Sequence, residues 1–261
     1  MRTTDMADEL FSAAAQPLPA GVRLATARHG GVTVTRVEIA REGLSRPRGR
    51  YVTLEMPSVS VLDERDAAVI EVCARELRAL LPPEGPVLVL GIGNRRVTAD
   101  ALGPRTAQKI LVTMGPQHTL PVRGIRPVAA LAPGVSGDTG LTLRQLAAAM
   151  VDAVRPAALI CVDSLCSAEA ARLGRTIQFS DTGLHPADAR HARHLDAAAL
   201  GVPVIAAGIP TLMDADEGAD LVLTPRALDS VIAHGSALLA GILNRALQPR
   251  LSVAQLCWLT G

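Results

Sequence analysis

Two aspartates follow short apolar runs of the kind that form buried strands. Asp163 comes directly after residues 157–162, and Asp100 lies a few positions beyond residues 86–91. A carboxylate in such a place is costly unless it is solvated, paired or used in chemistry. Two carboxylates that meet in one cleft cannot both ionise cheaply, so the pair holds one proton between them. One can then activate water while the other polarises or protonates an amide carbonyl, which is peptide hydrolysis without a covalent intermediate.

Each of these residues also has a plain structural interpretation. Asp100 suits the first turn of a helix, where a negative charge favours the helix dipole, and Asp163 suits a helix cap. His185 fits three roles that the sequence leaves open, namely a third polar group in the cleft, a metal ligand, or a loop histidine.

Other catalytic chemistries find weaker support in the sequence. Gly91 and Gly93 begin a dinucleotide-binding pattern whose third glycine is replaced by Arg96. The chain contains no GxSxG elbow and no HExxH zinc motif. A cysteine nucleophile at Cys166, near His185, remains conceivable, but it needs an activated thiolate.

The elements that must position these residues alternate between strands and helices. Apolar runs predict four buried parallel strands, at residues 86–91, 126–131, 157–162 and 202–207. Helical spacing fits between them, at about residues 100–113, 140–154 and 187–199. We therefore predict an α/β, phosphorylase/hydrolase-like fold, with a doubly wound, mostly parallel sheet and helices on both faces. In such a sheet, ligands bind beyond the carboxyl ends of the strands, where both aspartates lie.

The remaining segments extend this core. Residues 32–39 alternate with period two and residues 51–54 can return beside them, which predicts an N-terminal β-hairpin extension. Residues 175–180 read as an extra edge strand. Helices are predicted at residues 63–81 and 225–247. Residues 1–30 read as a loosely ordered leader, and the whole chain, 1–261, as a single domain.

Composition narrows the class of protein. The chain holds 26 basic and 25 acidic residues, so bulk attraction to nucleic acid is not indicated. Its four cysteines form no CxxC pair, and we predict no metal and no cofactor. Because no signal region and no apolar run of about 18 residues is present, we expect a cytoplasmic protein with no membrane partner.

Several long strings resemble the germination protease family, also called spore protease. The central motif appears as Leu90–Asn94 and Val97–Pro104, the hairpin signature as Gly49–Glu55, and a third motif as Thr176–Pro186. The stretch Asp5–Ala7 resembles the autoprocessing segment of that family. Further matching strings are Pro133–Gly140 and Gly208–Ala215.

The resemblance implies an aspartic-type endopeptidase that starts the degradation of small acid-soluble spore proteins at germination. Its catalytic aspartates fall on Asp100 and Asp163, with Asn94 and His185 as supporting candidates. It also implies a zymogen of the spore core that is trimmed at Asp5 and Met6, which makes residues 1–5 a short propeptide, and a homotetramer.

Two alternatives stay open at this point. The fold is expected to look like that of the hydrogenase maturation proteases, so a nickel-linked maturation peptidase would use Asp100, Asp163 and His185 as ligands. Residues 187–192 replace a glycine- and serine-rich loop of the germination proteases, which leaves room for a catalytically inactive pseudo-peptidase or binding module.

Overall fold

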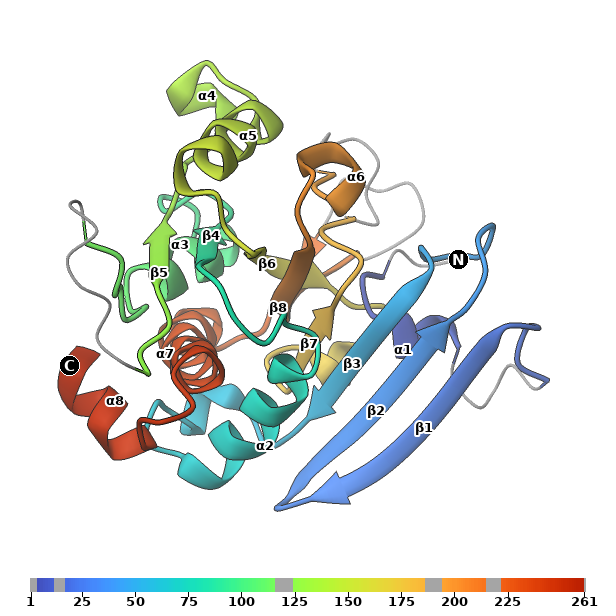
Figure 1. Cartoon of the computed structure of the whole chain (residues 1–261). Coiled ribbons are helices and arrows are strands. Elements are labelled where there is room, and N and C mark those ends of the chain that lie inside the picture. Colours follow the sequence, from blue (N-terminus) through green and yellow to red (C-terminus); the bar gives the residue numbers. More distant parts are fainter. Residues whose placement is uncertain (1–3, 12–16, 116–123, 186–193, 215–221, 261) are drawn as a thin grey trace.

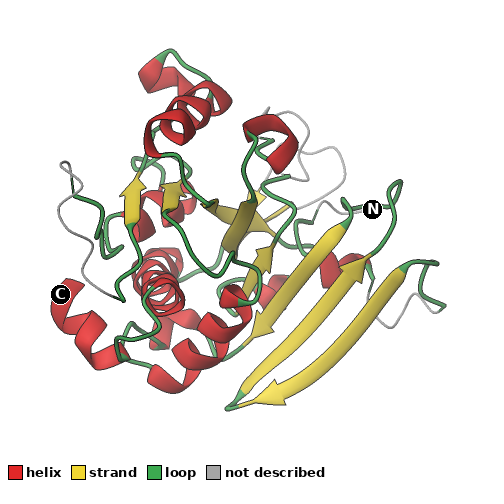
Figure 2. Cartoon of the chain, viewed as in Figure 1, coloured by secondary structure: helices red, strands yellow, loops and turns green. Residues whose placement is uncertain are grey.

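The structure is a computed structural model that describes residues 4–11, 17–115, 124–185, 194–214 and 222–260. Within these ranges the chain forms one mixed sheet of nine strands, flanked by helices (Figures 1 and 2). The strands are β1 (Val22–His29), β2 (Val32–Ile39), β3 (Gly49–Glu55), β4 (Val87–Gly91), β5 (Val128–Leu131), β6 (Ala158–Cys166), β7 (Thr176–Ser180), β8 (Val204–Asp214) and β9 (Val222–Leu223). The α-helices are α1 (Ala7–Leu10), α2 (Ala67–Arg78), α3 (Leu102–Ala107), α4 (Ser136–Thr139), α5 (Leu143–Val154), α6 (Ala197–Leu200), α7 (Leu228–Leu247) and α8 (Val253–Thr260).

The strand order divides the sheet into two halves. It runs β1-β2-β3-β7-β8-β6-β4-β5, and β9 pairs with the end of β8. Strands β8, β6, β4 and β5 are parallel neighbours, whereas β1, β2, β3, β7 and β8 pair in antiparallel fashion. The α/β class is confirmed, and the sheet is mixed, with its parallel strands confined to one half.

Alternating side chains of the parallel strands pack into two separate hydrophobic cores, one on each face of the sheet. Val87 and Val89 of β4 pack into the larger core with α2, α3 and α7. Leu88 and Leu90 face the opposite side, where α5 and α6 cover them. Both faces are therefore buried, which explains why these strands are continuously apolar in the sequence. Helices on both faces of the sheet were predicted, and this part of the prediction is confirmed.

The antiparallel half contains two differences from the sequence prediction. β2 and β3 form the predicted hairpin, but residues 22–29, assigned to a loosely ordered leader, form β1 and pair with β2 from Val22↔Ile39 to His29↔Val32. β7 is an interior strand, because it pairs with β3 on one side and β8 on the other, and not the predicted edge strand. It joins the hairpin extension to the parallel half.

Two predicted helices also differ. Instead of 100–113, α3 covers only Leu102–Ala107. The chain leaves the helix because Asn244 Oδ1 accepts the Leu111 amide, and the Thr113 and Met114 amides donate to the Val128 carbonyl. Of the predicted helix 187–199, residues 187–193 lie outside the described ranges, and α6 occupies the end of it.

Helix α7 is the longest helix of the fold. It begins at Leu228, three residues later than predicted, and ends at Leu247 as predicted. By length and composition it is apolar enough to span a membrane, but 72% of its apolar window is buried inside the fold. It is therefore the core helix that α2, α3 and α8 pack against.

Candidate active site

Of the two predicted aspartates, Asp163 lies on β6, and Asp100 lies in the loop that follows the neighbouring parallel strand β4. β4 and β6 pair in register from Val87↔Ala158 to Gly91↔Val162, and the Ile92 amide donates to the Val162 carbonyl at 2.7 Å. Asp163 directly follows Val162. It lies within β6 and not in the loop predicted after residue 162, because β8 continues the pairing beyond it.

Asp100 ends a 3-10 turn, Thr98–Asp100, in the loop after β4. Its Oδ2 accepts a hydrogen bond from the Asn94 main-chain amide at 2.7 Å, and Thr211 Oγ1 donates to the Ala99 carbonyl at 3.1 Å. Gly93 has φ +123°, and a Cβ there would lie 2.0 Å from the Asp100 carbonyl oxygen. The glycine thus permits the tight turn that directs this carboxylate.

Asn94 supports Asp100 through its main chain. Its side-chain Oδ1 instead accepts the Arg96 amide at 2.9 Å, which closes a local turn within the same loop. The structure therefore gives Asn94 an orienting contact with the carboxylate.

Asp163 lines a cavity of about 420 Å³, which includes its open mouth. The side chain is buried, and Oδ1 accepts the Ser164 amide at 2.8 Å. We call this space the Asp163 cavity, and its polar lining includes Asp5, Arg46, Asp163, Gln178, Thr182 and His185.

His185 is held in one tautomer. Its Nε2 lies 2.9 Å from the Thr182 carbonyl, which can only accept, so Nε2 carries the proton. Nδ1 of the neutral ring is then an acceptor, and His194 Nδ1, 3.2 Å away, donates to it. Burial lowers the pKa of His185, although Thr182 and Asp196 act in the opposite direction. The ring therefore faces the cavity in its neutral form near pH 7.

The N-terminal segment, residues 4–11, borders the Asp163 cavity at Asp5. The Asp5 amide donates to the Cys166 carbonyl at 2.8 Å, and Asp5 Oδ2 accepts the Cys166 amide at 2.8 Å. Arg46 reaches the same segment, because its Nη2 donates to the Thr4 carbonyl and lies 3.4 Å from Asp5 Oδ1. Arg46 Nη1 donates to the His185 carbonyl at 2.7 Å.

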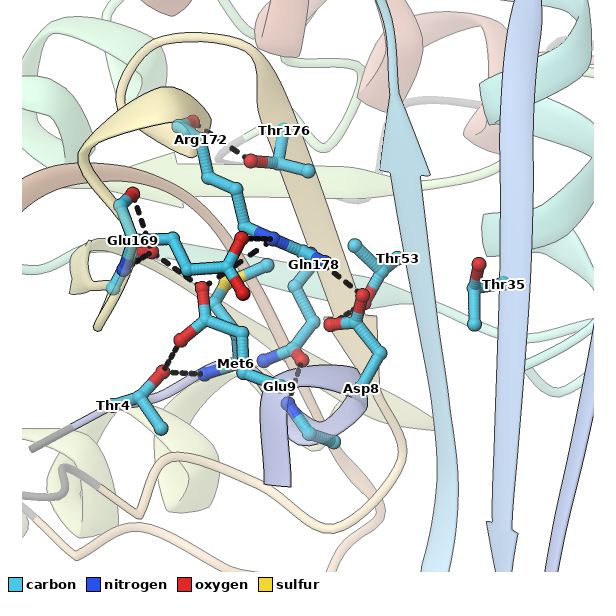
Figure 3. Close-up of polar contacts among 12 residues, drawn as sticks. Thr4, Met6, Asp8, Glu9, Thr35, Thr53, Glu169, Arg172, Thr176 and Gln178 are labelled. Carbon is cyan, nitrogen blue, oxygen red and sulfur yellow. Dashed lines mark hydrogen bonds and ion pairs between the residues drawn. The ribbon is translucent and has the colours of Figure 1, made fainter. Parts of the chain in front are cut away.

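A buried ionic cluster fixes the other end of this segment (Figure 3). Arg172 Nη1 donates to Asp8 Oδ2 at 2.6 Å, and its Nε lies 3.5 Å from Glu9 Oε1. Asp8 also accepts from Thr53 Oγ1 at 2.9 Å, and Glu9 accepts the Ala168 amide at 2.8 Å. The side chains of Asp8 and Glu9 are only 7% and 3% exposed, so both carboxylates depend on these partners.

The site residues predicted from the sequence thus fall in two places. Asp163, His185 and Asp5 line one cavity, Met6 is fully buried beside it, and Asp100 stands in the loop at the end of the adjoining strand. Among the described residues no three His, Cys, Asp or Glu side chains gather as metal ligands would. The nickel alternative therefore gains no support from this part of the chain.

Among the polar residues of the cavity that sequence reasoning missed are Gln178 and Arg46. Gln178 is 7% exposed and stands between the buried apolar residues Ile177 and Phe179, and an amide in such a place is a signal that could have been used. Arg46 is 8% exposed, but it stands among turn residues, where nothing in the sequence marks it.

Comparison with known proteins gives a consistent result. A family model described as germination protease matches residues 6–217. The germination protease of Clostridium perfringens is 32% identical over 282 residues, which cover 84% of this chain and 86% of the relative. That of Caldanaerobacter subterraneus is 39% identical over 208 residues, covering 75% and 64%. Among solved structures, the [NiFe] hydrogenase maturation protease HycI from Thermococcus kodakarensis is 16% identical with a TM-score of 0.44, covering 66% of this chain and 98% of that one.

The α/β fold, the matching family model and the related germination proteases define an endopeptidase. The chain belongs to the germination protease family.

Proposed function

We propose that this spore protease starts the degradation of small acid-soluble spore proteins during germination, in the spore core. Asp100 and Asp163 act as the pair that activates water and polarises the carbonyl. The observation that carries this proposal is that the chain's own residue Asp5 lines the same cavity as Asp163. An extended polypeptide therefore fits against this carboxylate.

In this proposal the two carboxylates share one proton. Each is oriented by a main-chain amide, Asp100 by that of Asn94 and Asp163 by that of Ser164. Fixed orientation lowers the entropic cost of bringing water, acid and base together. The ionised member takes a proton from water, and the protonated member donates a hydrogen bond to the carbonyl oxygen.

The N-terminal segment gives the proposed enzyme a zymogen form. While residue 5 is bonded to Cys166 and Arg46, it forms part of the wall of the Asp163 cavity. Cleavage between Asp5 and Met6 releases residues 1–5 and opens this space. The cluster of Asp8, Glu9 and Arg172 lies beyond the cut and keeps the remaining segment in place.

A cleavage assay tests the proposal. The wild-type chain, Asp100→Asn and Asp163→Asn are each incubated with a purified small acid-soluble spore protein, and the products are identified by mass. Asp152→Asn is the matched control, because Asp152 is exposed on α5. We expect cleavage by wild type and control alone. If cleavage survives both site substitutions, the aspartate pair is not catalytic. If folded, trimmed wild type does not cleave the protein, small acid-soluble spore proteins are not its substrate.

We further propose that the enzyme is a homotetramer, as its resemblance to the family implies. Sedimentation equilibrium of the 27.2 kDa chain measures this directly. A single species at the monomer mass would contradict it.

A further inference from the structure

Asp163 and Gln178 stand in one row across the sheet. Asp163 of β6 pairs with Gly208 of β8, and Gly208 pairs with Gln178 of β7. Residues that pair directly across a sheet point to the same face, so both side chains project to the side on which the Asp163 cavity lies. With strands spaced about 4.8 Å apart, the two main chains are about 10 Å apart.

Gly208 keeps the space between them open. It has no side chain, and a Cβ at this position would lie 2.4 Å from the Asp163 carbonyl oxygen and 2.7 Å from Leu165 Cγ. The glycine thus forms a floor between the carboxylate on one strand and the amide on the other.

Gln178 binds the main chain of the N-terminal segment on both sides of Met6. Its Nε2 donates to the Asp5 carbonyl at 2.8 Å, and its Oε1 accepts the Ala7 amide at 2.7 Å. The side chain points toward the segment beside Met6 (Figure 3). The carbonyl that Gln178 holds is that of the Asp5–Met6 peptide bond, the bond cut in the proposed trimming.

We propose that Gln178 is a catalytic residue that stabilises the negative charge on the carbonyl oxygen of the scissile bond. This inference rests on the proposed function. One aspartate takes a proton from water, and the water oxygen bonds to the Asp5 carbonyl carbon. The carbonyl π electron pair moves to the oxygen, which Gln178 Nε2–H holds. When that pair returns, the carbon–nitrogen bond breaks, and the Met6 nitrogen takes the proton from the aspartate.

The position of Gln178 suits this role. It is 7% exposed and is fixed by β3 and β8 on either side, so its donor needs no rearrangement as charge develops. Loss of one such donor typically slows the chemical step by about 10²–10³-fold.

The test follows trimming of the full-length chain, which is a unimolecular reaction, by intact mass. Gln178→Ala removes both hydrogen bonds, whereas Gln178→Glu keeps an acceptor for the Ala7 amide and loses the donor at neutral pH. Gln248→Ala is the matched control. Gln248 is 1% exposed and binds the Arg126 amide and carbonyl at 2.9 and 2.8 Å, and neither residue is among those that line the Asp163 cavity.

We expect trimming about 10²–10³-fold slower in both Gln178 variants, and at the wild-type rate in Gln248→Ala. Relative to wild type, Gln178→Glu regains activity as the pH falls, because its protonated carboxyl group donates a hydrogen bond. If Gln178→Glu is trimmed at the wild-type rate at neutral pH, the catalytic role of Gln178 is overturned, whereas the proposed zymogen is not affected. Absence of trimming between Asp5 and Met6 in wild type would overturn the proposed zymogen and this inference together.

Discussion

Asp5 and Cys166 are joined by two hydrogen bonds that use only main-chain atoms of Cys166. The Cys166 amide donates to Asp5 Oδ2 and the Cys166 carbonyl accepts from the Asp5 amide, both at 2.8 Å. The two residues are 161 positions apart in the chain. They meet where the register of β6 against β8 shifts, between Leu165 and Cys166. Neither of these two hydrogen bonds uses the thiol.

Replacement of Cys166 by alanine should leave trimming at the wild-type rate, because both main-chain bonds persist. Asp5→Ala is the contrasting variant, since it removes the carboxylate that the Cys166 amide and Arg46 bind. We expect it to trim about tenfold more slowly, as the loss of a charge-assisted hydrogen bond implies. Intact mass over time measures both. Loss of activity in Cys166→Ala would instead point to a cysteine nucleophile.

Replacement of Gly208 by alanine should impair both stability and cleavage. The added Cβ meets the Asp163 carbonyl oxygen at 2.4 Å, and main chain cannot move aside cheaply. We expect about 1–3 kcal/mol less stability in urea unfolding and a displaced Asp163 carboxylate. Gly137→Ala is the control, because nothing lies within 4 Å of its added Cβ. Equal stability of the two variants would show that β6 and β8 adjust freely.

Replacement of Arg172 by alanine should destabilise the fold by about 3 kcal/mol, because it leaves the buried carboxylates of Asp8 and Glu9 without their cation. Urea unfolding measures the change. Arg23→Ala provides the comparison, since Arg23 is 85% exposed and its pair with Glu38 is solvated, so no measurable change is expected. If both variants unfold alike, the buried cluster contributes no more than a surface pair.

Stability should fall as the pH drops below about 6.5, in part through His185. Burial lowers the pKa of this ring in the folded chain, so the unfolded chain binds its proton more readily. The contribution of His185 to stability is present when the pH is above the pKa that this ring has in the unfolded chain. It is lost as the pH falls toward the lower pKa of the ring in the folded chain. In His185→Gln, the melting temperature should depend less steeply on pH between about pH 7 and 5 than it does in wild type. His29→Gln, at an exposed hairpin end, should keep the wild-type slope.

The sequence was informative where local pattern and burial coincide. Asp163 stood out because a carboxylate after six apolar residues is unusual, and β6 is indeed buried on both faces. β1 was not predicted, because only Val22 of its eight residues is buried and the strand therefore has no clear apolar pattern. Its pairing with β2 defines it as a strand. Gly30 and Gly31, both at positive φ between paired His29 and Val32, were the overlooked hairpin signal.

The contacts that complete the cavity were beyond such reasoning. Arg46 meets a carbonyl 139 positions away, and Ala7 meets Gln178 across 171 positions. Partners this distant are brought together by the strand order, in particular by β7 lying in the interior of the sheet. A local pattern predicts that a polar group is buried, but it does not identify the group that satisfies it.

The strand β8 belongs to both halves of the sheet, with parallel β6 along one side and antiparallel β7 along the other. The larger core likewise includes Val34 and Leu54 from the hairpin together with Val89 from the parallel half. Melting of the hairpin would remove the pairing partner on one side of β7, the strand that joins the hairpin to β8, and would open that core. Loss of either half should therefore propagate to the other, so that thermal denaturation proceeds as one cooperative transition.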